Sequence, residues 1–248
     1  MQRYFVPKDQ FTLSTVKILG DDAHHLNRVL RARPKDRIIA CDGEGREVLA
    51  EIVELGKNGV AARIIEELPA NREPCVQVWI AQSLPKGDKM ETVIQKGTEI
   101  GASRFIPFVS ERTIVQYDSH KENKRLERWR KIAKEAAEQA NRSRIPLVEP
   151  PHSWQQLLKL VSSADAALFC YEKEEKTMLK NALREPLRTP KVILLMIGPE
   201  GGFTEKEADD ARSAGCRPVS LGRRILRTET AALVALAGIL YEFGEMGG

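Results

Sequence analysis

The stretch Ile197-Gly198-Pro199-Glu200-Gly201-Gly202-Phe203-Thr204 decides the fold of this chain. It follows the apolar run 192–196, which is typical of a buried strand. It precedes Thr204 to Glu207, where a threonine followed three residues later by a glutamate has the pattern of a capping box at a helix start. The sequence therefore predicts a strand, a tight loop and a helix. Such a loop lies at the carboxyl end of its strand, where open α/β sheets bind ligands.

The glycines of this loop allow its main chain to lie directly against a ligand, and Pro199 stiffens the turn. The loop is not a P-loop, because no Gly-Lys-Ser/Thr follows it, and it lacks the spacing of the dinucleotide fingerprint. Three interpretations stay open from these residues: a phosphate held at the helix start, a nucleoside held by backbone groups, and a tight turn needed for packing.

The composition is that of a globular protein, and 248 residues suffice for one large or two modest domains. No apolar run approaches the roughly 20 residues of a membrane span, and the first residues lack a signal peptide's apolar stretch. We therefore expect a cytoplasmic protein without a membrane partner. The cysteines at 41, 75, 170 and 216 are scattered, which argues against a disulfide framework and against a metal site.

Residues 1–70 predict a small β-barrel-like domain. The runs 37–41 and 46–53 flank Asp42-Gly43-Glu44-Gly45, a hairpin signal, and 59–65 is a third strand candidate. A short helix is expected over 21–31, with Leu26, Val29 and Leu30 on its apolar face. The segment 69–74 has two prolines in six residues and is typical of a linker.

Residues 75–248 predict a second domain of α/β type. Strands are expected at 75–80, 104–109, 166–170, 192–197 and 218–221. Helices are expected at 89–100, 122–141, 153–161, 204–214 and 229–243. Strands that alternate with helices indicate a mostly parallel sheet. A second polar loop, 222–228, follows the last strand, and Thr228 or Thr230 is expected to cap the helix after it.

Two basic clusters indicate phosphate contacts, and a solvated surface explains them equally well. The first contains Arg28, Arg31 and Arg33. The second runs along the predicted helix 122–141, where glutamates are interspersed, and continues to Arg142 and Arg144.

Taken together, the motifs resemble those of the RsmE family, the 16S rRNA (uracil-N3)-methyltransferases of the SPOUT class. The resemblance is carried by 197–203 and 221–231, the family's two cofactor-binding motifs. It extends to Gln82-Ser83-Leu84-Pro85-Lys86-Gly87-Asp88-Lys89-Met90-Glu91, to 95–101, 107–112 and 135–142, and to 24–31.

The resemblance implies a fold that spacing alone would not have reached. It implies a SPOUT-type α/β domain with a trefoil knot that binds S-adenosylmethionine, preceded by a PUA-like RNA-binding β-barrel. It also implies a homodimer that methylates N3 of a uridine in 16S rRNA within the small ribosomal subunit. The implied cofactor residues are Leu195, Ile197, Gly198, Glu200, Gly201, Leu221, Gly222, Ile225 and Leu226.

The implied reaction needs a group that stabilises negative charge on the uracil and a group that accepts the N3 proton. Arg112 or Arg227 is expected to stabilise the charge, and Glu99 or Glu229 to accept the proton. Each has a structural alternative: an ion pair for Arg112, surface solvation for Arg227, a helix end for Glu99 and helix capping for Glu229. Arg28, Arg31, Arg33, Arg142 and Arg144 are expected to hold RNA phosphates.

Three other functions are weighed against this one. The first is a methyltransferase of the same class that acts on another RNA or another atom. The second is a non-catalytic RNA-binding protein that kept the fold. The third, a nucleotide-phosphate enzyme, would need an acidic site for Mg²⁺, and the sequence arranges none.

Overall fold

The computed structural model of the chain describes residues 1–69, 72–114, 119–185 and 190–247, with 119–121 described by their backbone. These residues form two compact units. The N-terminal unit comprises Met1–Glu73 and Ala137–Ile145, and the C-terminal unit comprises Pro74–Ala136 and Pro146–Gly248. The inclusion of 137–145 in the first unit was not predicted, and the predicted domain end at residue 70 lies outside the described residues.

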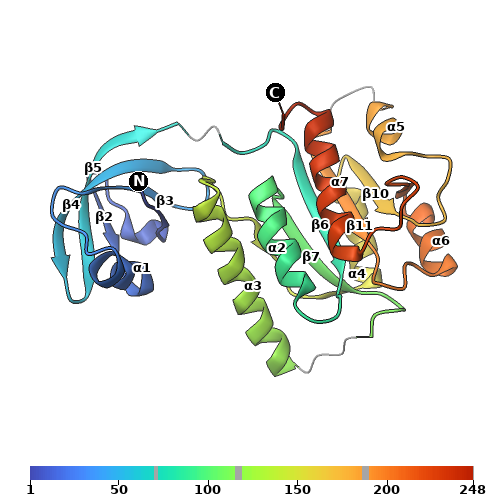
Figure 1. Cartoon of the computed structure of the whole chain (residues 1–248), viewed down its shortest axis with the longest axis horizontal. Helices are drawn as coiled ribbons and strands as arrows, with labels where there is room; N and C mark the ends of the chain where they lie inside the picture. Colours follow the sequence, from blue (N-terminus) through green and yellow to red (C-terminus); the bar gives the residue numbers. More distant parts are fainter. Residues whose placement is uncertain (70–71, 115–118, 186–189, 248) are drawn as a thin grey trace. The chain divides into compact units, whose positions relative to one another are not determined.

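A five-stranded sheet forms the N-terminal unit (Figure 1). Its strands are β1 (Arg3–Phe5), β2 (Thr15–Ile18), β3 (Arg37–Cys41), β4 (Glu47–Gly56) and β5 (Gly59–Leu68). Their order is β1-β3-β4-β5-β2, in which β1 pairs with β3 in parallel and the other pairs are antiparallel. Alternate side chains such as Val48, Ala50 and Ile52 are buried on one face, so this sheet has the half-barrel form of a PUA-like domain.

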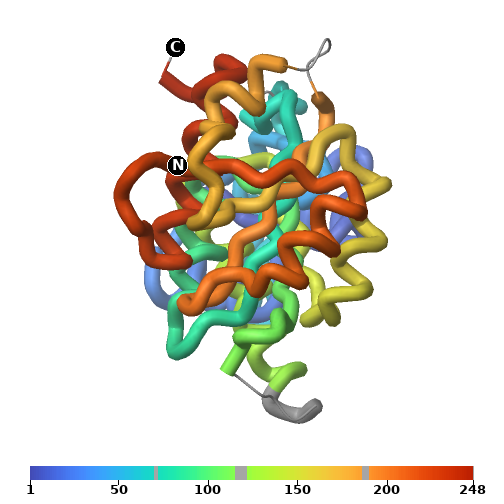
Figure 2. Tube along the Cα trace, turned by 90° about the vertical axis from the view of Figure 1, so that its right-hand side faces the viewer, coloured from blue at the N-terminus to red at the C-terminus, as the bar shows by residue number. Residues whose placement is uncertain are grey.

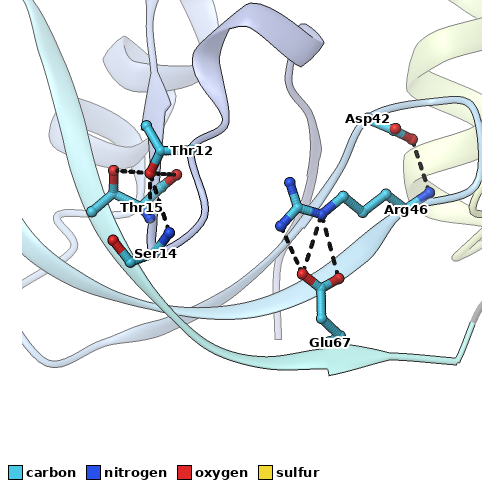
Figure 3. Close-up of polar contacts among 6 residues, drawn as sticks. All are labelled: Thr12, Ser14, Thr15, Asp42, Arg46 and Glu67. Carbon is cyan, nitrogen blue, oxygen red and sulfur yellow. Dashed lines mark hydrogen bonds and ion pairs between the residues drawn. The ribbon is translucent and has the colours of Figure 1, made fainter.

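The predicted hairpin at 42–45 is confirmed, and side chains fasten its strands. The Asp42 carboxylate accepts hydrogen bonds from the backbone N–H groups of Glu44, Gly45 and Arg46, at 2.8, 3.0 and 2.9 Å. The Arg46 guanidinium then pairs with Glu67 on β5, with Nη2 2.6 Å from Oε1 (Figure 3). These bonds hold the start of β4 against both of its neighbours.

The helix expected over 21–31 is shorter and changes form. An α-helix, α1 (Gly20–His24), continues as a π-helical turn, η2 (His25–Val29). Leu26 is buried, but Val29 is 63% exposed and Leu30 is 40% exposed. The predicted apolar face is therefore wrong for these two residues, because a π turn holds an extra residue and rotates the following side chains outward.

Residues 137–145 are held in the N-terminal unit by apolar and charged contacts. Ala137 is fully buried against Phe5. The Glu73 carboxylate accepts the Arg142 guanidinium, with Nη2 2.6 Å from Oε2, and also the backbone N–H of Arg144 at 3.1 Å. A half-buried carboxylate with this many donors fixes the returning segment.

A parallel sheet forms the C-terminal unit, as predicted. Its strands are β6 (Gln77–Ser83), β7 (Arg104–Val109), β8 (Leu147–Val148), β9 (His152–Ser153), β10 (Ala166–Cys170), β11 (Val192–Ile197) and β12 (Arg217–Val219). The order is β12-β10-β11-β6-β7-β8, with β9 also on β7, and all pairs are parallel. The trefoil knot concerns how the chain threads through itself, and it stays a prediction.

Helices cover both faces of this sheet. They are α2 (Lys89–Ile100), α3 (Ser119–Gln139), α4 (Trp154–Leu160), α5 (Leu179–Arg184), α6 (Glu205–Ser213) and α7 (Thr228–Glu242). Leu194 and Met196 pack in one core with residues of α4 and α6. Leu195 points to the other face, where α2 and α7 lie side by side (Figure 1). Among the described residues, no helix has both the length and the apolar character needed to cross a bilayer.

Candidate functional site

The loops after three neighbouring strands enclose a cavity in the C-terminal unit. These are 198–204 after β11, 220–227 after β12, and Tyr171-Glu172 after β10. The cavity has a volume of about 550 Å³ and lies at the carboxyl ends of parallel strands. Both long loops can be followed along the orange and red part of the trace in Figure 2.

The structure brings together eight of the nine residues expected to bind a cofactor. The cavity is lined by Ile197, Gly198, Glu200, Gly201, Leu221, Gly222, Ile225 and Leu226. The ninth, Leu195, has no exposed surface and lies within β11, outside the lining. The lining also includes Lys89, Arg224 and Thr228, which sequence reasoning did not place in the site. Arg224 and Thr228 lie within the motif 221–231 and Lys89 within the segment 82–91, but nothing in either stretch marks these side chains as part of the cavity wall.

The glycine loop is anchored by the aromatic residue that ends it. Phe203 is 2% exposed and stacks on Phe108, with ring centroids 6.4 Å apart. A Cβ at Gly198 would lie 3.2 Å from Cδ2 of Phe203, so the close packing leaves little room for a side chain there. Gly202 has φ +68°, in the left-handed region, and its N–H donates to Pro199 O at 2.9 Å. The loop thus closes as a tight turn that glycine favours.

The expected capping box at the start of α6 is confirmed, and its glutamate has a second role. Thr204 Oγ1 accepts from the N–H of Glu207, and the Glu207 carboxylate accepts from the N–H of Thr204. Glu207 is 3% exposed and also accepts from the backbone N–H of Glu111 at 2.8 Å. This bond fixes the turn that carries Arg112, whose Nη1 donates to Gly201 O at 2.5 Å. Arg112 therefore lies against the glycine loop.

The four expected catalytic residues lie in different places. Arg227 lines the cavity at the N-cap of α7, and its side chain is exposed. Glu229 follows in the first turn of α7, with Oε2 3.9 Å from Lys89 Nζ. Glu99 lies at the other end of α2 from Lys89, about 15 Å along the helix axis. There it is exposed and pairs with Lys96 at 2.8 Å.

Lys89 joins Glu200 to the start of α2. Lys89 Nζ lies 2.7 Å from Glu200 Oε1, which also accepts from the backbone N–H of Lys86 at 3.2 Å. Burial raises the pKa of the Glu200 carboxyl, but the bonds from Lys89 and from backbone N–H groups outweigh burial. The pKa therefore lies below its ordinary value of 4.5. Glu200 is ionised at neutral pH and holds the rim of the cavity.

This lowered pKa predicts an acid-dependent contribution to stability. A carboxyl whose folded pKa is depressed stabilises the fold above its unfolded pKa and loses that effect as the pH falls through the folded pKa. The thermal midpoint of a Glu200→Gln variant should therefore lie below that of the wild type at pH 7, and the gap should close as the pH falls below the ordinary carboxyl value of 4.5. Thermal melts across this range measure the gap. A gap that stays constant would contradict this reading of Glu200.

The expectation that Thr228 or Thr230 caps α7 is wrong. The N-cap residue is Arg227, and no side chain makes the capping hydrogen bond. Thr228 instead donates its hydroxyl to Gly198 O at 2.7 Å and accepts from Gln82 Nε2 at 2.8 Å. The Thr228 hydroxyl therefore links α7 to β6 and to the glycine loop, and it makes no hydrogen bond that caps its own helix.

The arginines expected to contact RNA divide into two groups. Arg28, Arg31, Arg33 and Arg144 are exposed in the N-terminal unit. Arg142 is 5% exposed and bound to Glu73, so the structure gives it an internal partner. We do not retain Arg142 as an RNA contact, because a phosphate would have to displace that buried ion pair.

The cavity suits a ligand of nucleoside size with apolar and polar parts. Its volume falls within the roughly 300–1,000 Å³ range of small-molecule sites. Leu221 and Leu226 supply apolar wall, while Gly198, Gly201 and Gly222 leave main-chain groups uncovered. S-adenosylmethionine has an apolar adenine face and polar edges, so these residues fit it. Among the described residues, no three His, Cys, Asp or Glu side chains are placed to hold a metal ion.

This fold and this cavity define an RNA methyltransferase with a PUA domain. The family model described as an RNA methyltransferase domain matches residues 71–240, and the model described as an RNA methyltransferase PUA domain matches 18–65. The chain belongs to the family of ribosomal RNA small subunit methyltransferase E. The family member from Bacillus subtilis is 43% identical over 98% of this chain and 97% of its own length. The member from Synechocystis is 37% identical over 96% of this chain and 76% of its own.

Solved structures of relatives have the same fold. A crystal structure titled as a hypothetical protein is 42% identical, with a TM-score of 0.88, over 97% of this chain and 98% of that one. The small subunit methyltransferase E of Neisseria gonorrhoeae, bound to S-adenosyl methionine, is 34% identical, with a TM-score of 0.85, over 97% of each chain. A protein from Legionella pneumophila, in complex with the bound cofactor SAM, is 30% identical, with a TM-score of 0.86, over 97% of each chain.

Proposed function

We propose that this protein transfers the methyl group of S-adenosylmethionine to N3 of a specific uridine in the 16S RNA of the small ribosomal subunit. The observation that carries the proposal is the cavity between 198–202 and 221–227, whose glycines uncover the main chain at the carboxyl ends of β11 and β12. Family membership supports the class of reaction, and the cofactor bound in two relatives supports the choice of methyl donor.

The residues of the cavity have the properties that binding this donor requires. When bound, S-adenosylmethionine supplies a methyl group carried on a positively charged sulfur. Leu221 and Leu226 would pack against the adenine and the methionine chain, while the backbone at Gly198 and Gly201 would meet the polar edges. These contacts would hold the donor in one orientation, and correct placement by itself lowers a barrier by several kcal/mol.

The uridine needs a group that stabilises charge, because N3 carries a proton at neutral pH and reacts once that proton leaves. As the proton leaves, negative charge spreads to O2 and O4 of the uracil. Arg227 lines the cavity with its side chain exposed, so it is the better placed of the two predicted arginines to meet that charge. Arg112 already donates to Gly201 O, so we assign it to holding the loop.

The position of Glu229 favours it over Glu99 as the proton acceptor. Its carboxylate lies in the first turn of α7, two residues from Arg227, and Oε2 has no hydrogen-bond partner among the described residues. The Glu229 carboxylate lies next to Lys89, with Oε2 3.9 Å from Lys89 Nζ, and would accept the proton that leaves N3.

Replacing Glu229 by glutamine should lower the rate of methyl transfer about 100-fold, which is typical for the loss of a general base. Glu99→Gln is the matched control, since it makes the same substitution at the far end of α2, and its rate should stay within about twofold. Single-turnover transfer of labelled methyl to RNA measures both. Equal losses in the two variants, or a larger loss at Glu99, would reverse the assignment.

The N-terminal unit would hold the RNA around the target. A base stacked in folded RNA must be extruded before its N3 can reach a methyl donor. Arg28, Arg31, Arg33 and Arg144 are exposed, and guanidinium groups bind phosphates well. We propose that they bind the phosphates that flank the extruded uridine.

Changing Arg28, Arg31 and Arg33 together to glutamine should weaken RNA binding and make it less sensitive to salt. Each lost phosphate contact lowers the slope of log affinity against log salt by about 0.7–0.9, so the slope should fall by about 2 to 3. Filter binding of a 16S RNA fragment at several salt concentrations measures it. Arg63→Gln, an exposed arginine of the same unit that pairs with Glu51, is the control. An unchanged slope in the triple variant would exclude these contacts.

Two further parts of the proposal concern assembly and location. We propose a homodimer, which the family resemblance implies and the exposed Val234 and Tyr241 of α7 support. We also propose that the enzyme works in the cytoplasm, where small ribosomal subunits are assembled. Analytical ultracentrifugation tests the dimer, and a monomer at all concentrations would refute it.

Primer extension tests the reaction itself. N3 methylation blocks Watson–Crick pairing, so reverse transcriptase stops at the modified uridine. RNA from a strain that lacks this protein should lose one stop in 16S RNA, and the purified enzyme should restore it. Mass spectrometry of the nucleoside identifies the methylated atom. An unchanged 16S pattern with a modified nucleoside in another RNA would favour the same-class alternative.

A further inference from the structure

A chain of buried hydrogen bonds crosses the C-terminal unit beneath the cavity. Gln82, near the end of β6, has no exposed surface, and its Nε2 donates to Ser83 O at 2.9 Å and to Thr228 Oγ1 at 2.8 Å. Thr228 is 6% exposed, and its Oγ1 donates to Gly198 O at 2.7 Å. The direction is determined, because Gly198 O can only accept, so Thr228 must donate to it and accept from Gln82. We call this chain the Gln82–Thr228–Gly198 bridge.

The bridge joins the two loops that form the cavity to one rigid strand. Gln82 pairs with Ile197 in the sheet register, directly before the glycine loop begins. Thr228 is the first residue of α7, directly after the loop 220–227 ends. The bridge therefore sets the separation between Gly198, the first residue of the glycine loop, and Thr228, the residue that directly follows the loop 220–227.

Gln82 itself is outside the cavity lining, whereas Gly198 and Thr228 are part of it. Any effect of Gln82 on a ligand must therefore pass through Thr228. If the Thr228 hydroxyl is lost, Gly198 O loses its donor and the Gln82 amide loses one of its two acceptors, and leaving buried groups short of partners costs more than the bond itself contributes. The loops then relax to other separations.

We infer that Gln82 and Thr228 are positioning residues that set the width of the cavity and thereby the affinity for the methyl donor. The inference rests on the proposed function for the identity of that donor, S-adenosylmethionine. It assigns the bridge to binding rather than to the chemical step, since neither side chain is needed to move a proton or to stabilise charge on the uracil.

Two nearly isosteric variants test the bridge by calorimetry with S-adenosylmethionine. Thr228→Val and Gln82→Met should each weaken binding about tenfold, the value of one buried hydrogen bond. The double variant should bind no more than about twofold more weakly than either single one, because one bridge is lost in all three. At saturating donor, kcat should stay within about threefold. Thr228→Ser, which keeps the hydroxyl, should restore the affinity, and Thr230→Val, an exposed threonine of the same helix, should leave it unchanged.

Normal donor affinity in Gln82→Met would overturn the inference, and so would fully additive losses in the double variant. Either result would mean that Thr228 contacts the ligand on its own. A loss of affinity in Thr228→Ser equal to that in Thr228→Val would also overturn it. A shift in thermal midpoint without a change in affinity would identify a merely structural role.

Hydrogen exchange of the ligand-free protein separates this inference from the proposed function. Amides of 198–202 and 225–231 should exchange faster in Thr228→Val than in Thr228→Ser or Thr230→Val. Faster exchange in a protein that binds no S-adenosylmethionine would support the bridge and refute the function. Unchanged exchange in folded Thr228→Val would refute the bridge whatever the ligand. If Gln82→Met does not fold, the comparison of the two Thr228 variants decides the question.

Discussion

Replacing Gly198 by valine should weaken the binding of S-adenosylmethionine about 10- to 100-fold. A Cβ at this position would lie 3.2 Å from Cδ2 of Phe203 and 3.3 Å from its backbone nitrogen, and valine adds two methyl groups beyond it. Phe203 cannot move away, because it is 2% exposed and packs against Phe108 and Phe169. Overpacking of this kind costs about 1–3 kcal/mol, and the loop must shift into the cavity to relieve it. Isothermal calorimetry measures the loss.

Gly238→Ala is the matched control for this variant. Gly238 lies within α7, and a Cβ there would make an ordinary contact at 3.4 Å with Leu179. Its affinity for the donor should stay within about twofold, since alanine is a better helix former than glycine and nothing needs to move. Wild-type affinity in a folded Gly198→Val protein would place the donor elsewhere in the molecule.

Replacing Arg227 by alanine should lower kcat about 100- to 1,000-fold, the usual loss when one preorganised charge-stabilising donor is removed. Arg227 lines the cavity, and its exposed side chain can approach a uracil held at the opening. Arg227 would stabilise the negative charge that develops on the uracil as the N3 proton leaves, and this charge is absent when only the donor is bound. The Arg227→Ala variant should therefore bind S-adenosylmethionine within about threefold of the wild type. Single-turnover methyl transfer and calorimetry measure the two quantities separately.

Arg223→Ala provides the control for Arg227, because it is an exposed arginine of the same loop that lies outside the cavity lining. It should keep kcat within about twofold. If Arg227→Ala loses donor affinity and turnover together, Arg227 is a structural residue of the binding site. If it loses neither, the charge on the uracil is stabilised by another group.

Local patterns predicted most of the C-terminal unit. Helix α2 begins and ends at the predicted residues, because the helical spacing of its apolar residues is a strong signal. Strands β10 and β11 also have the predicted bounds, because strands covered on both faces of a sheet are continuous apolar runs. The capping boxes at Ser153 and Thr204 are confirmed, since their hydrogen bonds join residues three apart and need no tertiary information.

The predictions that failed depend on contacts distant in sequence. Threonine is a residue type that commonly caps helices, yet the Thr228 hydroxyl bonds to Gly198 and Gln82, which lie 30 and 146 residues away along the chain. Arg142 belongs to a basic run, yet Glu73 binds it inside the N-terminal unit. No local pattern records such partners. The eight lining residues were found because a motif of known chemistry marks two loops, and the parallel sheet brings both loops to the same edge, with only β10 between their strands.

A crystal structure with S-adenosylmethionine added is the most direct test of the central claim. The donor should lie between residues 198–202 and 221–227, with its adenine against Leu221 and Leu226 and its methyl group toward Arg227. A donor bound at any other surface of the chain, with these two loops empty at saturating concentration, would contradict it.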